Sequence, residues 1–339
     1  MSDGLGAGGW AKRVGTLVLT VVVVVGIAAG GAFVSDQTSD DDPDRGVSMA
    51  EFQPENVTVD RAAAEGEITP DRSVVSEGGT VVIDDSHSNR WDRETIEPLV
   101  RGLTRVGYEV EVHQSGDLAA ALDDAKALVV IDPGQELPSG DVDDIRRFTG
   151  QGGHLMVAGE PNRVGISASL FGTSLTTRES SLTTLGAAYG ASVDTAYLRN
   201  QETADVNYKW IQTRSTDAEG MADVEQTSMY TAAAVRVRGG EPLLRAAPET
   251  RPSDSDDTTD TYPVAVRKNN AVWLGDKTFM RGDRYRVADN EVFLTYLVEF
   301  LASSDRDTSQ SLDGDSDDDG SGGSQNQTVG GTEPVDSNY

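Results

Sequence analysis

The chain has 339 residues, a net charge of −29 at pH 7 and no cysteine. The missing cysteine excludes disulfides, thiolate metal sites and a cysteine nucleophile. Acidic residues outnumber Lys plus Arg by 57 to 28. This excess argues against nucleic-acid binding and is typical of a halophilic protein, whose acidic surface stays hydrated in salt.

The N-terminal residues predict a membrane anchor. Residues 1–13 end in Lys12-Arg13, and about 21 uncharged, mostly apolar residues follow at 14–34, enough to span ~30 Å of hydrocarbon. Acidic residues begin at Asp36. The positive-inside rule therefore puts the N-terminus in the cytoplasm and the rest outside the cell. A cleaved signal peptide is the alternative, but the run exceeds a signal core and Ala32-Phe-Val34-Ser35 is a poor cleavage site.

The remaining chain divides into an acidic linker at 35–49, an α/β domain at 50–303 and a disordered acidic tail at 304–339. Short apolar strands alternate with amphipathic helices in the first half of the domain, which predicts a mostly parallel sheet with helices on both faces. The expected strands are 80–84, 108–113, 127–131 and 155–158, and the expected helices are 93–106, 118–125 and 142–149. Gly107 should end the first helix, and Asp117 and Ser139 should cap the next two.

The second half of the domain has weaker patterns. A helix is expected at 182–189, strands at 208–213 and 232–237, and a hairpin joining 263–267 to 271–274 around Asn269-Asn270. The last element is an apolar-faced helix at 291–301, capped by Asp289 or Asn290.

Polar residues follow the strands at the points where the strands end. Because ligands bind outside the carboxyl ends of strands in open α/β sheets, these residues mark the expected site. The ligand-binding candidates are Asp85, His87, Asn89, Arg90, Glu160, Asn162 and Asp276. Arg90 has two open interpretations: its forked guanidinium binds a carboxylate or phosphate, or it forms an ion pair with Asp84, Asp85 or Glu160.

Several blocks resemble a known family. They are Ile83-Asp-Asp-Ser-His-Ser-Asn-Arg90, Ile96-Glu-Pro-Leu-Val100, Gly153-His-Leu-Met-Val-Ala-Gly159, Leu274-Gly-Asp276 and Val287-Ala-Asp-Asn290. The chain resembles, over roughly 50–303, a membrane-anchored domain of unknown function from halophilic archaea that is similar to class I glutamine amidotransferases. That group also resembles the auxiliary subunits of gliding-motility-type ABC transporters. The resemblance implies a flavodoxin-like or amidotransferase-like fold in an extracytoplasmic setting.

Active amidotransferases place a cysteine on a strand-to-helix turn, which here would be Ala158-Gly159-Glu160-Pro161. Without cysteine, glutamine hydrolysis by that mechanism is excluded. Ser86 or Ser88 with His87 is a poor nucleophile pair, because adjacent residues rarely reach each other and a Gly-x-Ser-x-Gly elbow is missing.

These observations favour a non-catalytic, membrane-anchored binding or accessory subunit that recognises a small anionic or sugar-like ligand or a membrane-protein partner. One alternative is a metal-assisted hydrolase built from Asp85, His87, Glu160 and Asp276, and another is a purely structural subunit of a membrane complex. No cofactor, bound metal or catalytic residue is expected.

Overall fold

The computed structural model describes residues 66–169, 172–202, 207–256, 261–309 and 311–312, which all belong to one unit spanning 60–339. The predicted cytoplasmic N-terminus, membrane anchor and linker, at 1–13, 14–34 and 35–49, lie outside the described residues. Within those residues, the structure contains no helix with the length and apolar character that a membrane crossing requires.

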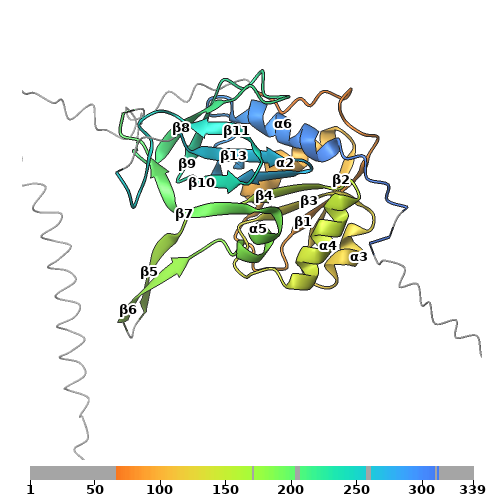
Figure 1. Ribbon diagram of the computed structural model, residues 1–339, viewed down its shortest axis with the longest axis horizontal. Helices are drawn as coiled ribbons and strands as arrows, with labels where there is room; N and C mark the ends of the chain where they lie inside the picture. The colour runs from red at the N-terminus through yellow and green to blue at the C-terminus, as the bar shows by residue number, and fades with distance from the viewer. Residues whose placement is uncertain (1–65, 170–171, 203–206, 257–260, 310, 313–339) are drawn as a thin grey trace, which may run out of the picture. The chain divides into compact units, whose positions relative to one another are not determined.

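A nine-stranded sheet forms the centre of the unit (Figure 1). Its strands, in sheet order, are β2 (Tyr108–His113), β1 (Gly79–Asp84), β3 (Ala125–Ile131), β4 (His154–Ala158), β14 (Ala271–Leu274), β13 (Pro263–Lys268), β11 (Glu241–Ala246), β8 (Trp210–Ser215) and β9 (Gln226–Tyr230). Neighbours from β2 to β14 are parallel, and neighbours from β14 to β9 are antiparallel.

Helices cover both faces of the parallel half. One layer contains α2 (Arg93–Arg105), the short helix η2 (Thr278–Met280) and α6 (Asn290–Ala302), and the other contains α3 (Leu118–Leu122), α4 (Ser139–Gly150) and α5 (Thr183–Tyr189). Within β1, Val81 and Ile83 pack towards the first layer and Val82 towards the second. The inner strands β1, β3, β4 and β14 are mainly apolar because they are buried on both faces, whereas the edge strand β2 alternates apolar and charged residues and is partly exposed.

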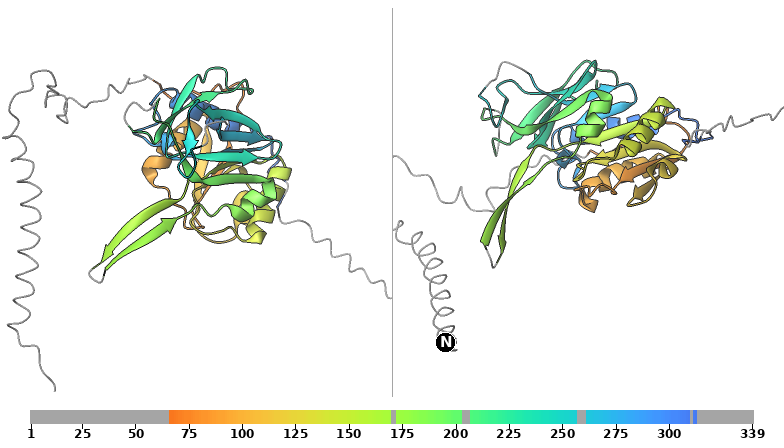
Figure 2. Two further views of the ribbon diagram at one scale, coloured as in Figure 1. Left: turned by 60° about the vertical axis from the view of Figure 1, so that its left-hand side comes forward. Right: turned by 60° about the horizontal axis from the view of Figure 1, so that its bottom comes forward.

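Two smaller sheets flank the central one. Strands β7 (Ala191–Arg199), β10 (Ala233–Val237) and β12 (Arg251–Pro252) form a three-stranded antiparallel sheet with β7 in the middle. Strands β5 (Arg163–Ser169) and β6 (Gly172–Arg178) form a two-stranded sheet of their own. Figures 1 and 2 show this hairpin, here called the arm, projecting from the rest of the unit.

The α/β class and the parallel arrangement of the first strands are confirmed. The predicted hairpin is also correct: β13 pairs with β14, and Asn269 in the turn has a φ of 50°. Gly107 ends α2 with a φ of 95°, in the left-handed region that favours glycine. The carboxylate of Asp117 caps α3 by accepting a hydrogen bond from the Ala119 backbone N–H at 3.0 Å.

Other expectations about helix ends are wrong. Ser139 does not cap α4, because the helix already includes it and Pro138 precedes it without a side-chain cap. Asp289 precedes α6, but its carboxylate accepts hydrogen bonds from the Glu225 and Gln226 backbones instead. Helix α3 ends at Leu122, because Ala125 already starts β3.

The structured domain continues past the predicted boundary at Ser303. Arg306 is fully buried and Leu312 is 1% exposed, and Leu312 donates its backbone N–H to Asp123 at 2.7 Å. The first residues of the predicted tail therefore belong to the fold, and 313–339 lie outside the described residues. The arm and strands β7, β9, β11 and β12 were not predicted.

Candidate functional site

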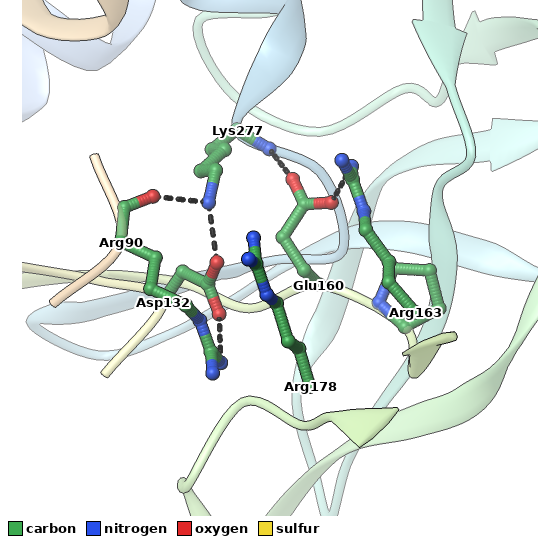
Figure 3. A pocket seen from close by; sticks show the side chains of 7 residues that line it. Arg90, Asp132, Glu160, Arg163, Arg178 and Lys277 are labelled. Carbon is green, nitrogen blue, oxygen red and sulfur yellow. Dashed lines mark hydrogen bonds and ion pairs between the residues drawn. The ribbon is translucent and has the colours of Figure 1, made fainter. Parts of the chain in front are cut away.

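The carboxyl ends of β3, β4 and β14 and the loop after β1 meet at one edge of the sheet, as the sequence predicts. A cavity of about 210 Å³ opens there (Figure 3). Its lining residues are Arg90, Asp132, Glu160, Pro161, Arg163, Arg178 and Lys277. We call this cavity the edge pocket.

The loop after β1 is fixed against the turn after β3. The backbone N–H groups of Gly134 and Gln135 both donate to the carbonyl of His87 at 3.0 Å. A Cβ atom at Gly134 would lie 2.6 Å from the Ser88 carbonyl oxygen, so this close approach requires glycine. The loop therefore holds Arg90 at a defined place beside Asp132.

Asp132 is the anchor of one side of the pocket. Its backbone is left-handed, with a φ of 43°, a conformation that Asp tolerates better than most residues. One carboxylate oxygen accepts from Arg90 Nη2 at 2.7 Å and from Ser180 Oγ at 2.6 Å, and the other pairs with Lys277 Nζ. Burial raises the pKa of Asp132, but the hydrogen bonds from Arg90, Lys277 and Ser180 and the charge of Lys277 outweigh it, so the pKa lies below its ordinary value.

Glu160 forms the opposite side. Its Oε1 accepts the backbone N–H of Lys277 at 3.0 Å, and its Oε2 pairs with the guanidinium of Arg163. Burial raises the pKa of Glu160 to about 8, and the nearby carboxylate of Asp276 acts in the same direction against Arg163 and Lys277.

Arg178 differs from the other three cations of the pocket. Arg90, Arg163 and Lys277 each form an ion pair with a lining carboxylate, whereas Arg178 has neither a hydrogen bond nor an ion pair with any described residue. Figure 3 shows its side chain pointing into the pocket, with no dashed line to it. A guanidinium without a partner leaves all its donors available to a ligand.

The arm supplies both Arg163 and Arg178. The two residues lie opposite each other at the base of the β5–β6 hairpin. That base is attached to the sheet edge: Asn162 donates its backbone N–H to the Thr195 carbonyl at 2.8 Å, and Ser180 Oγ accepts from the Glu160 backbone at 2.8 Å. The two arginines are therefore positioned by fixed backbone on each side.

Of the seven predicted binding residues, Arg90 and Glu160 line the pocket. Arg90 also forms the ion pair expected under its structural interpretation, but with Asp132 rather than with Asp84, Asp85 or Glu160. The amide of Asn162 donates to Glu179 at 2.9 Å beside the pocket, and Asp85 does not line it. The amide of Asn89 accepts from the His87 backbone and donates to the Ile131 carbonyl, so it holds the loop.

Asp276 is fully buried beneath the pocket. Its carboxylate accepts from the Thr278 backbone at 2.6 Å, from the Thr278 hydroxyl at 2.7 Å and from the Tyr230 backbone at 3.0 Å. Burial raises its pKa and these hydrogen bonds oppose the rise. The carboxylate thus joins η2 to β9 and is not among the residues that line the edge pocket.

His87 lies in a separate buried network. Its Nδ1 is 2.9 Å from Asp84 Oδ2 and its Nε2 is 3.1 Å from Asp141 Oδ2. The hydrogen bond with Asp84 raises the pKa of His87 against the effect of burial. Ser86 Oγ donates to Asp84 Oδ1 at 2.6 Å and lies 3.0 Å from His87 Nδ1, so the expectation that these adjacent side chains would not reach each other is wrong. Serine and histidine both bond to the Asp84 carboxylate, which holds them in the loop.

The four residues of the metal hypothesis do not form a cluster. Across the part of the chain that the structure describes, no group of three or more His, Asp or Glu side chains could hold a metal ion. The partners of His87 and Asp276 given above account for their polar atoms. The structure therefore gives no support to a metal site built from Asp85, His87, Glu160 and Asp276.

Sequence reasoning missed Arg163, Arg178 and Lys277. Lys277 directly follows Gly275-Asp276, so its position at a strand end was a usable signal. Arg163 and Arg178 can be recognised as pocket residues only once the arm between them is known, because that hairpin brings together residues from opposite ends of a 16-residue segment.

Comparison with solved structures gives similarities at low identity. The N-terminal domain of mmIFT52 is 11% identical, with 67% of this chain and 98% of that domain covered and a TM-score of 0.51. A ThuA-like protein from Bacteroides uniformis is 10% identical, covering 68% of this chain and 94% of that chain at a TM-score of 0.43. The first similarity shows a shared fold and carries no information on activity.

No curated protein matches the sequence. A family model described as a domain of unknown function, DUF4350, matches residues 97–298, which include most of the sheet and six of the seven pocket residues. The expected assignment to a domain of unknown function is confirmed, and the chain belongs to the DUF4350 family.

Proposed function

We propose that this protein is a membrane-anchored, extracytoplasmic and non-catalytic binding subunit that recognises a small anion in the edge pocket. The observation that carries the proposal is the charge of the pocket: four cations and two carboxylates line it, in a chain whose net charge is −29. Guanidinium groups match carboxylate and phosphate oxygens. Binding of an anionic ligand would account for this local excess of positive charge in so acidic a protein.

Binding fits the lining better than conversion does. None of the seven lining residues is a serine, threonine, cysteine or histidine, so the pocket wall offers no hydroxyl, thiol or imidazole for nucleophilic catalysis. Three cations are held by ion pairs, which fix the shape of the pocket before a ligand arrives. A preformed site loses less conformational entropy when it binds a ligand.

The finer fold assignment and the setting belong to the same proposal. The parallel strand order β2-β1-β3-β4-β14 is that of flavodoxin-like sheets and supports an amidotransferase-like relationship. Glu160 follows β4 at the turn where such enzymes carry their cysteine. The apolar run at 14–34 with cations before it and aspartates after it supports an anchor with the domain outside the cell, as in a halophilic archaeon.

Anion binding is tested by thermal unfolding of the full-length protein in detergent at fixed ionic strength. Phosphate, sulfate and small carboxylates at 100 times Kd should each add about 2.7 kcal/mol to the free energy of unfolding. Arg178→Gln should weaken anion binding at least about tenfold, and so lower this stabilisation, since it removes the unpaired guanidinium.

Arg214→Gln is the matched control, because Arg214 is an exposed strand arginine outside the pocket. The control should bind anions as the wild type does. If no anion raises the melting temperature, or if both variants behave alike, the edge pocket is not the binding site.

The setting is tested in native membranes. The protein should stay in the membrane during alkaline carbonate extraction, and protease added outside the cell should digest the domain. A variant lacking 14–34 should be released from the membrane. Crosslinked membrane proteins that co-purify equally well with Arg178→Gln would instead favour a structural subunit whose partners do not use the pocket.

A further inference from the structure

We infer that the edge pocket takes a doubly charged tetrahedral oxyanion, the terminal group of a phosphomonoester, held between Arg163 and Arg178. This inference rests on the proposed function and names the class of ligand. It follows from three features of the pocket: the number of charges, the placement of the two arginines and the size of the cavity.

The first feature is the count of charges. Arg90 and Lys277 share the single carboxylate of Asp132, and Arg163 pairs with Glu160. Four cations therefore line a pocket whose walls hold two carboxylates, so two positive charges are not matched within the lining. A pocket with two or more uncompensated positive charges is matched by a dianion, whereas a monoanion leaves a charge unpaired.

The second feature is the pairing of the two arginines. Arg163 and Arg178 are direct cross-strand neighbours in an antiparallel ribbon. Like charges placed directly opposite each other destabilise such a pair, and no carboxylate of the pocket pairs with Arg178. An oxyanion between them removes the repulsion. The unpartnered fork of Arg178 can give two parallel hydrogen bonds to tetrahedral oxygens, and Arg163, whose Nη2 is held by Glu160 and Thr231, adds its charge and its remaining donors.

The third feature is size. The cavity of about 210 Å³ is smaller than the roughly 300–1,000 Å³ of pockets that enclose drug-sized ligands. It suits a phosphoryl group whose ester substituent lies outside. The substituent can belong to a small soluble metabolite or to a lipid headgroup, since both present the same terminal group to the two arginines.

The test compares sulfate with methanesulfonate, binding to the full-length protein in detergent at pH 6.5 and fixed ionic strength. Both ions are tetrahedral and similar in size, but sulfate carries two charges and methanesulfonate carries one. Sulfate should bind at least about tenfold more tightly by calorimetry, and Arg178→Gln should abolish most of this preference. Arg178→Lys keeps the charge without the fork and should retain an intermediate preference, whereas Arg214→Gln should retain all of it.

Equal affinity for the two ions, lost together in Arg178→Gln, would overturn the dianion while leaving the proposed anion site standing. Absence of binding of either ion would overturn both. Binding of glycerol 3-phosphate in solution and of phosphatidate in mixed micelles then distinguishes a soluble metabolite from a lipid headgroup as the ligand. Tighter binding of either one than of methanesulfonate supports the inference, and binding of neither contradicts it.

Discussion

Glu160 is the residue where the site and the stability of the fold are linked. It is 4% exposed and lies near a second buried carboxyl, Asp276. In the unfolded chain Glu160 ionises near 4.5, and in the folded protein burial raises its pKa to about 8. Between these values the native state holds a proton that the unfolded state has lost, so stability falls as pH rises through this range.

Glu160→Gln removes this titration. Between pH 5 and 8.5 the free energy of unfolding of the wild type should fall relative to that of the variant. The fall should not exceed roughly 5 kcal/mol, which is the difference between the folded and unfolded pKa values converted into free energy. Urea unfolding at several pH values measures it. Glu109→Gln, at an exposed site on β2, should follow the wild-type profile. Parallel profiles for Glu160→Gln and the wild type would contradict the prediction.

Arg306 is the second residue whose burial has a measurable consequence. Its Nη1 donates to the carbonyls of Leu122, Asp123 and Ala125 at 3.0, 2.7 and 2.8 Å. Arg306→Ala would leave these carbonyls without that donor and create a cavity, which should cost about 3 kcal/mol or more. Urea unfolding measures the loss, and the exposed Arg238→Ala should change stability by less than about 0.5 kcal/mol. If Arg306→Ala leaves the free energy of unfolding unchanged, the segment after Ser303 does not stabilise the domain.

At the scale of elements, and among the described residues, the strands of the arm pair only with each other, so we expect the arm to be separable from the domain. Its strands hydrogen-bond to each other as a two-stranded sheet, while its base is held by the bonds of Asn162 and Ser180. Val164 and Thr177 are directly opposite each other, so an Asn-Gly turn replacing 165–176 would close a short hairpin on them.

This shortened arm should change the melting temperature by less than about 3 °C, which corresponds to roughly 1 kcal/mol for a domain of this size. Anion binding should persist, because Arg163 and Arg178 remain at the base. Thermal unfolding with and without sulfate checks both points. A loss of several kcal/mol would mean that the distal arm packs on the domain.

At the scale of the whole molecule, the net charge of −29 sets the response to salt. Charge repulsion favours the unfolded chain, and the Debye length falls from about 10 Å at 0.1 M to about 3 Å at 1 M. The melting temperature should therefore rise by at least about 5 °C between 0.1 and 1 M NaCl. Sucrose of equal osmolality is the uncharged control and should produce a smaller rise. A melting temperature that stays constant or falls in NaCl would contradict the prediction.

The sequence predicted the parallel half of the fold well. Buried strands such as Ala127–Ile131 are apolar runs, and helices such as Arg93–Arg105 have a capping aspartate and a glycine end, so local patterns agree with the final structure. The antiparallel half was predicted poorly. Strands such as Glu241–Ala246 carry mixed polar residues and gain stability from pairing with β8 and β13, which lie elsewhere in the chain and which a local pattern does not record.

The sequence by itself determined the acidic character, the absence of cysteine chemistry, the α/β class and the edge of the sheet where the pocket lies. Each depends on composition or on local periodicity. Only the tertiary structure decided which polar side chains share that edge. It placed His87 and Asp276 in buried networks and brought Arg163, Arg178 and Lys277 to the pocket. The reason is that a pocket joins side chains from loops far apart in the chain, and their meeting depends on strand order and on the arm.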